Sequence, residues 1–175
     1  MEYKYLSQKD KMPPICPKDK EAAVRKLIID KLSQGELVYM STISPDGWPI
    51  TDCLHFATVP GENDRPIFYL FTHENTRKLE NIANNKRVSI SVCHTVSFER
   101  RNETWAFQFM GLAEEVKDKA EIDRAIKANR EKKGYEFTAH LPLEQQPCIR
   151  VEPVFGSFTC PQADPKACSI DYLAK

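Results

Sequence analysis

Apolar residues between positions 19 and 34 repeat with the period of an α-helix. Four of them share one face of that helix: Val24, Leu27, Ile28 and Leu32. Gly35 follows at once, and glycine is common just after the last turn of a helix. We therefore expect a helix over residues 19–34.

Six further segments have the composition or the alternation of β-strands. Residues 87–92 alternate strictly between polar and apolar, as in a strand with one buried face, whereas residues 67–72 are apolar on both faces. The run S-P-D-G at 44–47 predicts a tight turn between the first two segments. Gly111 interrupts the longest segment and predicts a bulge or a close backbone approach. The six segments are residues 37–43, 49–58, 67–72, 87–92, 104–116 and 149–158.

Two more helices lie between the strands. A short helix begins near Asn75 or Thr76, and a longer one covers residues 118–133, where Asp118 and Glu121 resemble a capping box. Neighbouring strands are joined mostly by short turns. This order predicts a mainly β, α+β fold, in which helices cover the ends of a small antiparallel barrel.

The length of 175 residues is enough for one domain with a real core and too short for two comfortable ones. We expect that domain over residues 19–158. An irregular N-terminal arm precedes it over residues 1–18. A polar C-terminal tail follows over residues 159–175, and its pattern predicts no element.

The composition excludes some classes of function. Hydrophobic residues make up 41% and charged residues 29%, and 25 basic residues balance 25 acidic ones. A nucleic-acid-binding protein usually has a basic excess or a basic face, so we expect no nucleic-acid partner. The N-terminus has no signal-like apolar segment, and no apolar run approaches the ~20 residues of a membrane helix. We therefore expect a cytoplasmic protein without a membrane partner.

The six cysteines form no C-x-x-C pair, and scattered cysteines in a reducing compartment are usually buried thiols. Cys160 and Cys168 flank a short loop, so a disulfide or a metal site between them is the alternative. Two cysteines without a histidine cluster make a poor zinc site, which favours free thiols and no metal.

The short middle helix carries two cations, Arg77 and Lys78, in its first turn. A helix N-terminus is already partly positive, so cations there are welcome only beside an anion. The unpaired N–H groups of the first turn and the Thr76 hydroxyl suit a phosphate, as do a guanidinium and an ammonium. The alternative is a solvated helix face, which charge alone favours.

The wider pattern favours the phosphate. Three runs, LVYMSTISPDGWPI, FYLFTHENTRKLENIANNKRVSISV and FQFMGLAEEV, follow one another between Leu37 and Val116. In this order and spacing they resemble the pyridoxamine 5'-phosphate oxidase-like family of FMN-binding split barrels. The resemblance implies a six-stranded antiparallel split β-barrel and a homodimer with FMN at the subunit interface.

Carried onto this chain, the resemblance assigns cofactor-binding roles to nine residues. Arg77 and Lys78 would hold the phosphate with Thr76, and Phe71 and Thr72 would also contact FMN. A segment of the second strand would meet the isoalloxazine ring through its backbone, and Gln108 lies near a family glutamine. The nine are Asp52, Cys53, Leu54, Phe71, Thr72, Thr76, Arg77, Lys78 and Gln108.

The chain also departs from that family. Asp52 and Ala57 stand where pyridoxamine phosphate oxidases carry an arginine and a lysine, and the tail lacks their Arg-x-His motif. We therefore expect an FMN-dependent oxidoreductase acting on another substrate, with NAD(P)H as one candidate donor and no catalytic residue assigned. Two alternatives stay open: a non-catalytic flavin store or sensor, and a barrel that binds haem or a deazaflavin.

Other residues near the expected site have two interpretations each. His55 could hydrogen-bond the flavin or be a packed neighbour, and His73 could approach the phosphate or face solvent. Trp105, Phe107 and Phe109 alternate along one strand. They could stack on a ring, but aromatic residues at this period are more often core or interface, and we expect dimer packing.

Overall fold

The computed structural model describes residues 12–94, 96–132 and 141–174. Within these ranges the α-helices are α1 (Lys18–Gln34), α2 (Arg77–Asn84) and α3 (Lys119–Glu131). The strands are β1 (Leu37–Ile43), β2 (Pro49–His55), β3 (Ala57–Pro60), β4 (Pro66–Phe71), β5 (Arg87–His94), β6 (Trp105–Val116), β7 (Cys148–Thr159) and β8 (Ala167–Asp171). Short 3-10 turns are η2 (Glu62–Asp64), η3 (Phe98–Glu103) and η5 (Leu143–Gln145).

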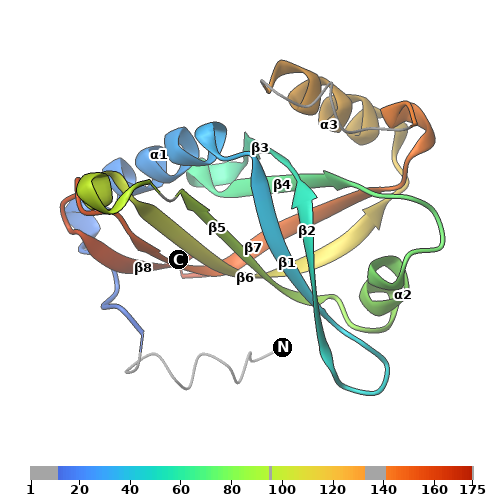
Figure 1. The fold of residues 1–175 in the computed structure, drawn as a ribbon, viewed down its shortest axis with the longest axis horizontal. Coiled ribbons are helices and arrows are strands. Elements are labelled where there is room, and N and C mark those ends of the chain that lie inside the picture. The colour runs from blue at the N-terminus through green and yellow to red at the C-terminus, as the bar shows by residue number, and fades with distance from the viewer. Residues whose placement is uncertain (1–11, 95, 133–140, 175) are drawn as a thin grey trace.

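The strands form one curled antiparallel sheet in the order β2-β1-β5-β6-β7-β4-β3, with β8 paired to β7 (Figure 1). Helices α1 and α3 both pack on β3, and α2 packs on β1 and β6. The expected α+β split barrel is confirmed. The strand count differs, because the structure has two strands more than the six predicted.

The first extra strand arises because the predicted strand over 49–58 breaks at Phe56. Before the break β2 pairs with β1, and after it β3 pairs with β4, at the opposite end of the sheet order. The Phe56 ring is buried 5.8 Å from that of Phe68. Lys132 Nζ donates to the Phe56 carbonyl at 2.8 Å and lies 3.3 Å from the ring centroid. One continuous segment of the sequence therefore forms β2 and β3, the strands at the two ends of the sheet order.

The second extra strand, β8, lies in the segment expected to be a tail. Phe158 of β7 is opposite Cys168 of β8, and Ile170 is also buried. The arm contributes as well, since Ile15 forms a parallel bridge with Ser169. Residues 1–11 of the expected arm, residue 133 at the expected end of the third helix, and His140 fall outside the described residues.

The structure confirms one expectation about β6 and contradicts another. The ladder to β7 shifts register between Met110 and Gly111, and a Cβ on Gly111 would lie 2.7 Å from the Glu152 carbonyl oxygen. Trp105 and Phe107 point inward, and their rings stack with centroids 4.9 Å apart. Phe109 is buried beside Phe107. These aromatic residues therefore belong to the core of the chain itself. The expectation that they pack at a dimer interface is wrong.

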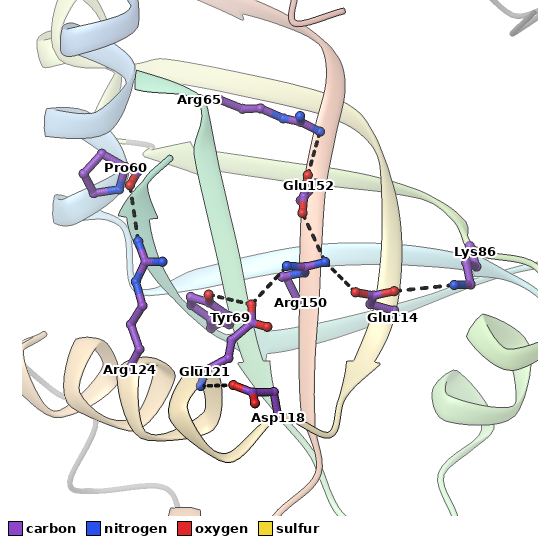
Figure 2. Close-up of polar contacts among 10 residues, drawn as sticks. All are labelled: Pro60, Arg65, Tyr69, Lys86, Glu114, Asp118, Glu121, Arg124, Arg150 and Glu152. Atoms are coloured by element: carbon purple, nitrogen blue, oxygen red, sulfur yellow. Dashed lines mark hydrogen bonds and ion pairs between the residues drawn. The ribbon is translucent and has the colours of Figure 1, made fainter. Parts of the chain in front are cut away.

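Helix α3 is fastened to the sheet through its first turn. Asp118 caps it as predicted, because its carboxylate accepts the Glu121 N–H at 2.8 Å. The Glu121 side chain turns to the sheet, where it accepts from Tyr69 at 2.9 Å and from Arg150 at 3.2 Å (Figure 2). Burial and this hydrogen bond raise the pKa of Tyr69 to about 12.

Arg150 also pairs with Glu114 and Glu152, so three carboxylates surround its guanidinium in the network of Figure 2. None of the helices in the described ranges has the length and apolarity to span a membrane.

Candidate functional site

The candidate site lies where β4 turns into α2. Strand β4 ends at Phe71, and Asn75 adopts the left-handed conformation with φ 56°, which asparagine tolerates better than most residues. Thr76 is extended and is the N-cap residue, so α2 begins at Arg77. The helix therefore begins one or two residues after the predicted Asn75 or Thr76, and Arg77 and Lys78 occupy its first turn as predicted.

Two backbone N–H groups at the start of α2 have no carbonyl partner among the described residues. The Thr76 carbonyl accepts from the N–H groups of Leu79 and Glu80 at 3.1 and 3.4 Å. In the part of the chain that the structure describes, no backbone carbonyl accepts from the N–H groups of Arg77 and Lys78. Such free donors at the positive end of a helix suit an anion.

Thr76 itself adds a further unused donor. Its side chain makes no capping bond to the helix. Its Oγ1 is buried and has no partner among the described residues. Leaving a hydroxyl buried without a partner costs roughly 1–3 kcal/mol, so this atom is expected to meet a ligand or a water molecule.

The two cations of the first turn differ in their surroundings. Arg77 is exposed, and within the described ranges its guanidinium has no ion-pair partner. Lys78 is only 8% exposed. Its Nζ donates to Thr72 Oγ1 at 3.4 Å and lies 3.5 Å from Asp52 Oδ1. Lys78 is thus fixed in place, while Arg77 is free to move toward a ligand.

Asp52 is the unexpected member of this group. From the sequence, Asp52 counts only as a missing positive charge, whereas in the structure its carboxylate, 25% exposed, compensates the buried Lys78 ammonium. With Arg77 included, the three side chains carry a net charge of +1 (two cations and one carboxylate). The site therefore favours an anion, though less strongly than two unopposed cations would.

A buried hydrogen bond holds α2 against β1. Asn81 Nδ2 donates to Thr42 Oγ1 at 2.9 Å, and both side chains are almost fully buried. Because Asn81 lies three residues after Lys78, this bond fixes the helix that presents the Lys78 ammonium. Sequence reasoning did not identify either residue.

The remaining predicted site residues divide between two faces of the sheet. Phe71 is buried, and Leu54 is half-buried against the main core. Cys53 and Gln108 are exposed on the outer face, in one row with Tyr39 and Ser91. Three strand spacings, roughly 14 Å in all, separate Cys53 from Gln108. The structure therefore brings Asp52, Thr72 and Lys78 together but leaves Gln108 apart from them.

Hollows near the site differ in character. One of about 550 Å³ borders Thr76, but Glu74, Glu80 and Glu115 line it, and three carboxylates would repel a phosphate. Another, of about 300 Å³, lies over β1, β5 and β6. Its lining is mostly apolar and includes Ile43 and Met110. A phosphate is therefore expected on the Lys78 side of α2, and the outer sheet face offers room for an apolar group.

Three histidines lie within the described residues. His73 is exposed, and His55 ends β2 in a half-buried position. His94 stacks on Trp105 with ring centroids 5.7 Å apart. Within the described ranges, no three histidine, cysteine or carboxylate side chains form a metal-binding group.

The chain is similar to one known family and to several solved structures. The family model described as pyridoxamine 5'-phosphate oxidase matches residues 25–159. No curated protein matches the chain significantly.

A conserved hypothetical protein of Mycobacterium tuberculosis has a TM-score of 0.60 at 18% identity, covering 85% of this chain and 84% of that one. The haem storage protein HutZ of Vibrio cholerae has a TM-score of 0.55 at 17% identity, covering 73% and 89%. A haem-binding protein of Mycobacterium smegmatis has a TM-score of 0.63 at 13% identity, covering 90% and 59%. At these identities the likeness shows the fold alone.

Proposed function

Since the chain belongs to the pyridoxamine 5'-phosphate oxidase family, we propose that it binds FMN, with the phosphate at the N-terminus of α2. The observation that carries the proposal is the buried Thr76 hydroxyl, which has no partner in the described part of the chain and stands at the start of α2. Arg77 and Lys78 follow it in the first turn. A phosphate bound at the start of α2 would accept hydrogen bonds from donors of this kind.

Each residue has a distinct role in this proposal. The Thr76 hydroxyl and the N–H groups of the first turn donate to phosphate oxygens. Lys78 supplies a fixed charge, positioned by Thr72 and Asp52. Arg77 supplies a guanidinium that is free to form two parallel hydrogen bonds.

The ring is assigned to β2. This strand is at one end of the sheet order and pairs only with β1 among the described strands, so one edge of its backbone around Cys53 and Leu54 is open. Gln108 lies too far along the outer face to join the Lys78 group of its own chain. We therefore infer a homodimer in which Gln108 approaches the flavin of the partner subunit.

Bound FMN supplies the redox chemistry, and the protein binds and orients it. The function proposed is an FMN-dependent oxidoreductase that accepts electrons from a reduced donor such as NAD(P)H. Asp52 and Ala57 argue against the vitamin-forming oxidase reaction, because two family cations are missing there. A haem site is the second candidate, since two proteins of similar fold are described as haem-binding or haem-storing.

The test compares FMN with riboflavin, which lacks the phosphate. In Arg77→Ala/Lys78→Ala, FMN affinity should fall at least tenfold, because each charge-assisted contact contributes roughly 1.5–3 kcal/mol. Riboflavin affinity should be unchanged. Asp52→Asn/Lys78→Met removes the ion pair as a unit and controls for an unpaired carboxylate. Lys127→Ala, on the exposed face of α3, is the matched control.

Equal loss of both ligands, or unchanged FMN binding, would contradict the phosphate assignment. The absorbance spectrum of the purified protein decides between cofactors, since a flavin spectrum supports FMN and a Soret band supports haem. Bleaching by NAD(P)H, followed by reoxidation, separates an enzyme from a flavin store.

A further inference from the structure

A hollow of about 660 Å³ lies where α1 and α3 pack on β3, at one end of the sheet order (Figure 1). Its volume falls within the roughly 300–1,000 Å³ that is usual for small-molecule sites. The end of α1 lines it together with Gly35 and Glu36, as do β3 and three residues around the end of α3: Ala128, Glu131 and Lys132. These residues are distinct from those of the candidate phosphate site.

Among the described residues that line the hollow, only Lys132 carries an amine. Its side chain is half-buried. The Lys132 Nζ donates to the Phe56 carbonyl at 2.8 Å and to the Leu32 carbonyl at 3.4 Å. It also lies 3.3 Å from the centroid of the Phe56 ring. A carbonyl accepts from a neutral amine as well as from an ammonium, so these bonds hold the nitrogen in both protonation states.

The surroundings of Lys132 favour its neutral form. In the described ranges no carboxylate forms an ion pair with its Nζ, although Glu36 and Glu131 line the same hollow. Burying an ammonium without such a partner favours the neutral amine. The Phe56 ring and the Glu36 carboxylate oppose this effect, but burial outweighs it and lowers the pKa of Lys132 to about 7. A large share of this amine is therefore nucleophilic at neutral pH, whereas an exposed lysine is almost wholly protonated.

We propose that Lys132 is a covalent ligand site, at which its amine forms an imine with an uncharged aldehyde or ketone that enters the hollow. The nitrogen lone pair attacks the carbonyl carbon, and the electron pair of the C=O bond moves to oxygen. That oxygen leaves as water with the two amine hydrogens, and a C=N bond forms. Nothing is oxidised or reduced. Once protonated, the imine keeps one N–H, which is enough for the shorter bond to the Phe56 carbonyl.

The lining of the hollow selects the class of ligand. Two carboxylates, Glu36 and Glu131, outnumber the single Lys132 cation, so an aldehyde that carries a carboxylate or a phosphate is repelled. Val59 and Pro60 of β3 add apolar surface. The ligand is therefore a neutral carbonyl compound with an apolar body, for which benzaldehyde is a suitable probe.

The experiment treats the full chain with benzaldehyde at pH 7 and traps the imine with sodium cyanoborohydride. Peptide mapping should find the benzyl group on Lys132 at least about tenfold sooner than on Lys127, an exposed lysine of α3, because far more of the Lys132 amine is neutral. This advantage should shrink toward pH 10, where exposed lysines also lose their proton. The anionic probe 4-carboxybenzaldehyde should label Lys132 more slowly than benzaldehyde does.

Two variants distinguish a ligand site from a reactive side chain alone. Ala128→Phe fills part of the hollow, so it should slow the labelling of Lys132 several-fold and leave that of Lys127 unchanged. Lys132→Arg keeps a donor for the Phe56 carbonyl but forms no imine, and the benzyl group at this position should disappear.

Mapping of the unsubstituted protein decides the matter even where a variant fails to fold. Labelling of Lys132 no sooner than Lys127 would overturn the proposal. Equal labelling of Lys132 by benzaldehyde and 4-carboxybenzaldehyde would overturn it as well, because the hollow would then not select an uncharged ligand.

Discussion

Lys78 is a buried cation whose charge is already opposed within the chain. The Asp52 carboxylate 3.5 Å away compensates it, and Thr72 accepts a further hydrogen bond. A phosphate that approaches Lys78 also approaches the Asp52 carboxylate, so the same residue that positions the cation weakens its attraction for the ligand. In the proposed phosphate site, Asp52 would therefore lower the affinity that Lys78 and Arg77 supply.

Asp52→Asn should therefore strengthen FMN binding. The amide still accepts a hydrogen bond from Lys78 but carries no charge. The lost repulsion, discounted for the partial exposure of Asp52, is about 1 kcal/mol, which corresponds to roughly a fivefold lower dissociation constant. Fluorescence titration with FMN and with riboflavin measures it, and only FMN should respond. Weaker FMN binding would contradict this prediction and would mean that the Asp52 charge is needed to hold Lys78 in position.

The sequence predicts Asp52 and Thr72 as site residues along with the cations, but not that these two contact Lys78. Thr76, Arg77 and Lys78 are adjacent in the chain, and a helix start fixes their relative positions locally. The Lys78–Asp52 and Asn81–Thr42 contacts join residues far apart in sequence, so they depend on how α2 packs against β1 and β2. No local pattern carries that information.

At the scale of elements, Gly111 lies where β6 and β7 approach too closely to admit a Cβ atom. An alanine Cβ there would lie 2.7 Å from the Glu152 carbonyl oxygen and 3.0 Å from Val151 Cγ1. Both are closer than van der Waals contact, and the first neighbour is backbone that cannot rotate away.

Gly111→Ala should therefore destabilise the protein by roughly 1–3 kcal/mol, the usual cost of overpacking. Urea unfolding followed by fluorescence measures the change. Ala106→Ser, at an exposed position of the same strand, should lie within about 0.5 kcal/mol of the original. Equal stability of Gly111→Ala would show that β6 and β7 can separate at the bulge.

Elements with a clear period were predictable, and the two missed strands were not. Helix α1 and strand β5 match their expected ranges closely, because periodic burial appears directly in the sequence. The break at Phe56 leaves no trace in the alternation of 49–58, since barrel closure produces it. Strand β8 is buried at three successive residues within a polar tail, which hides any alternation.

At the scale of the whole molecule, the domain extends beyond the matched family range. That match ends at residue 159, whereas β8 lies at Ala167–Asp171 and covers β7. Paired with the arm through Ser169, β8 joins both ends of the described chain to the core.

Deleting residues 161–175 should therefore destabilise the whole domain. It removes the buried Cys168 and Ile170 and opens the edge of β7. We expect a fall of at least about 10 °C in melting temperature or loss of soluble protein. Deleting only residues 173–175 is the matched control, because Leu173 is exposed. Differential scanning fluorimetry on both truncations decides, and equal melting temperatures would show that β8 is dispensable.

The bend at Phe56 links regions of the molecule that the sheet order sets far apart. Lys132, just after α3, contacts both the carbonyl and the ring of Phe56 at this bend. Asp52 lies only four residues before Phe56, on β2. A sideways displacement of α3 would thus pull on the main chain that leads to the Asp52 carboxylate. Helix α3 and the strand that carries Asp52 are therefore connected through one residue, Phe56, although they contact opposite ends of the sheet order.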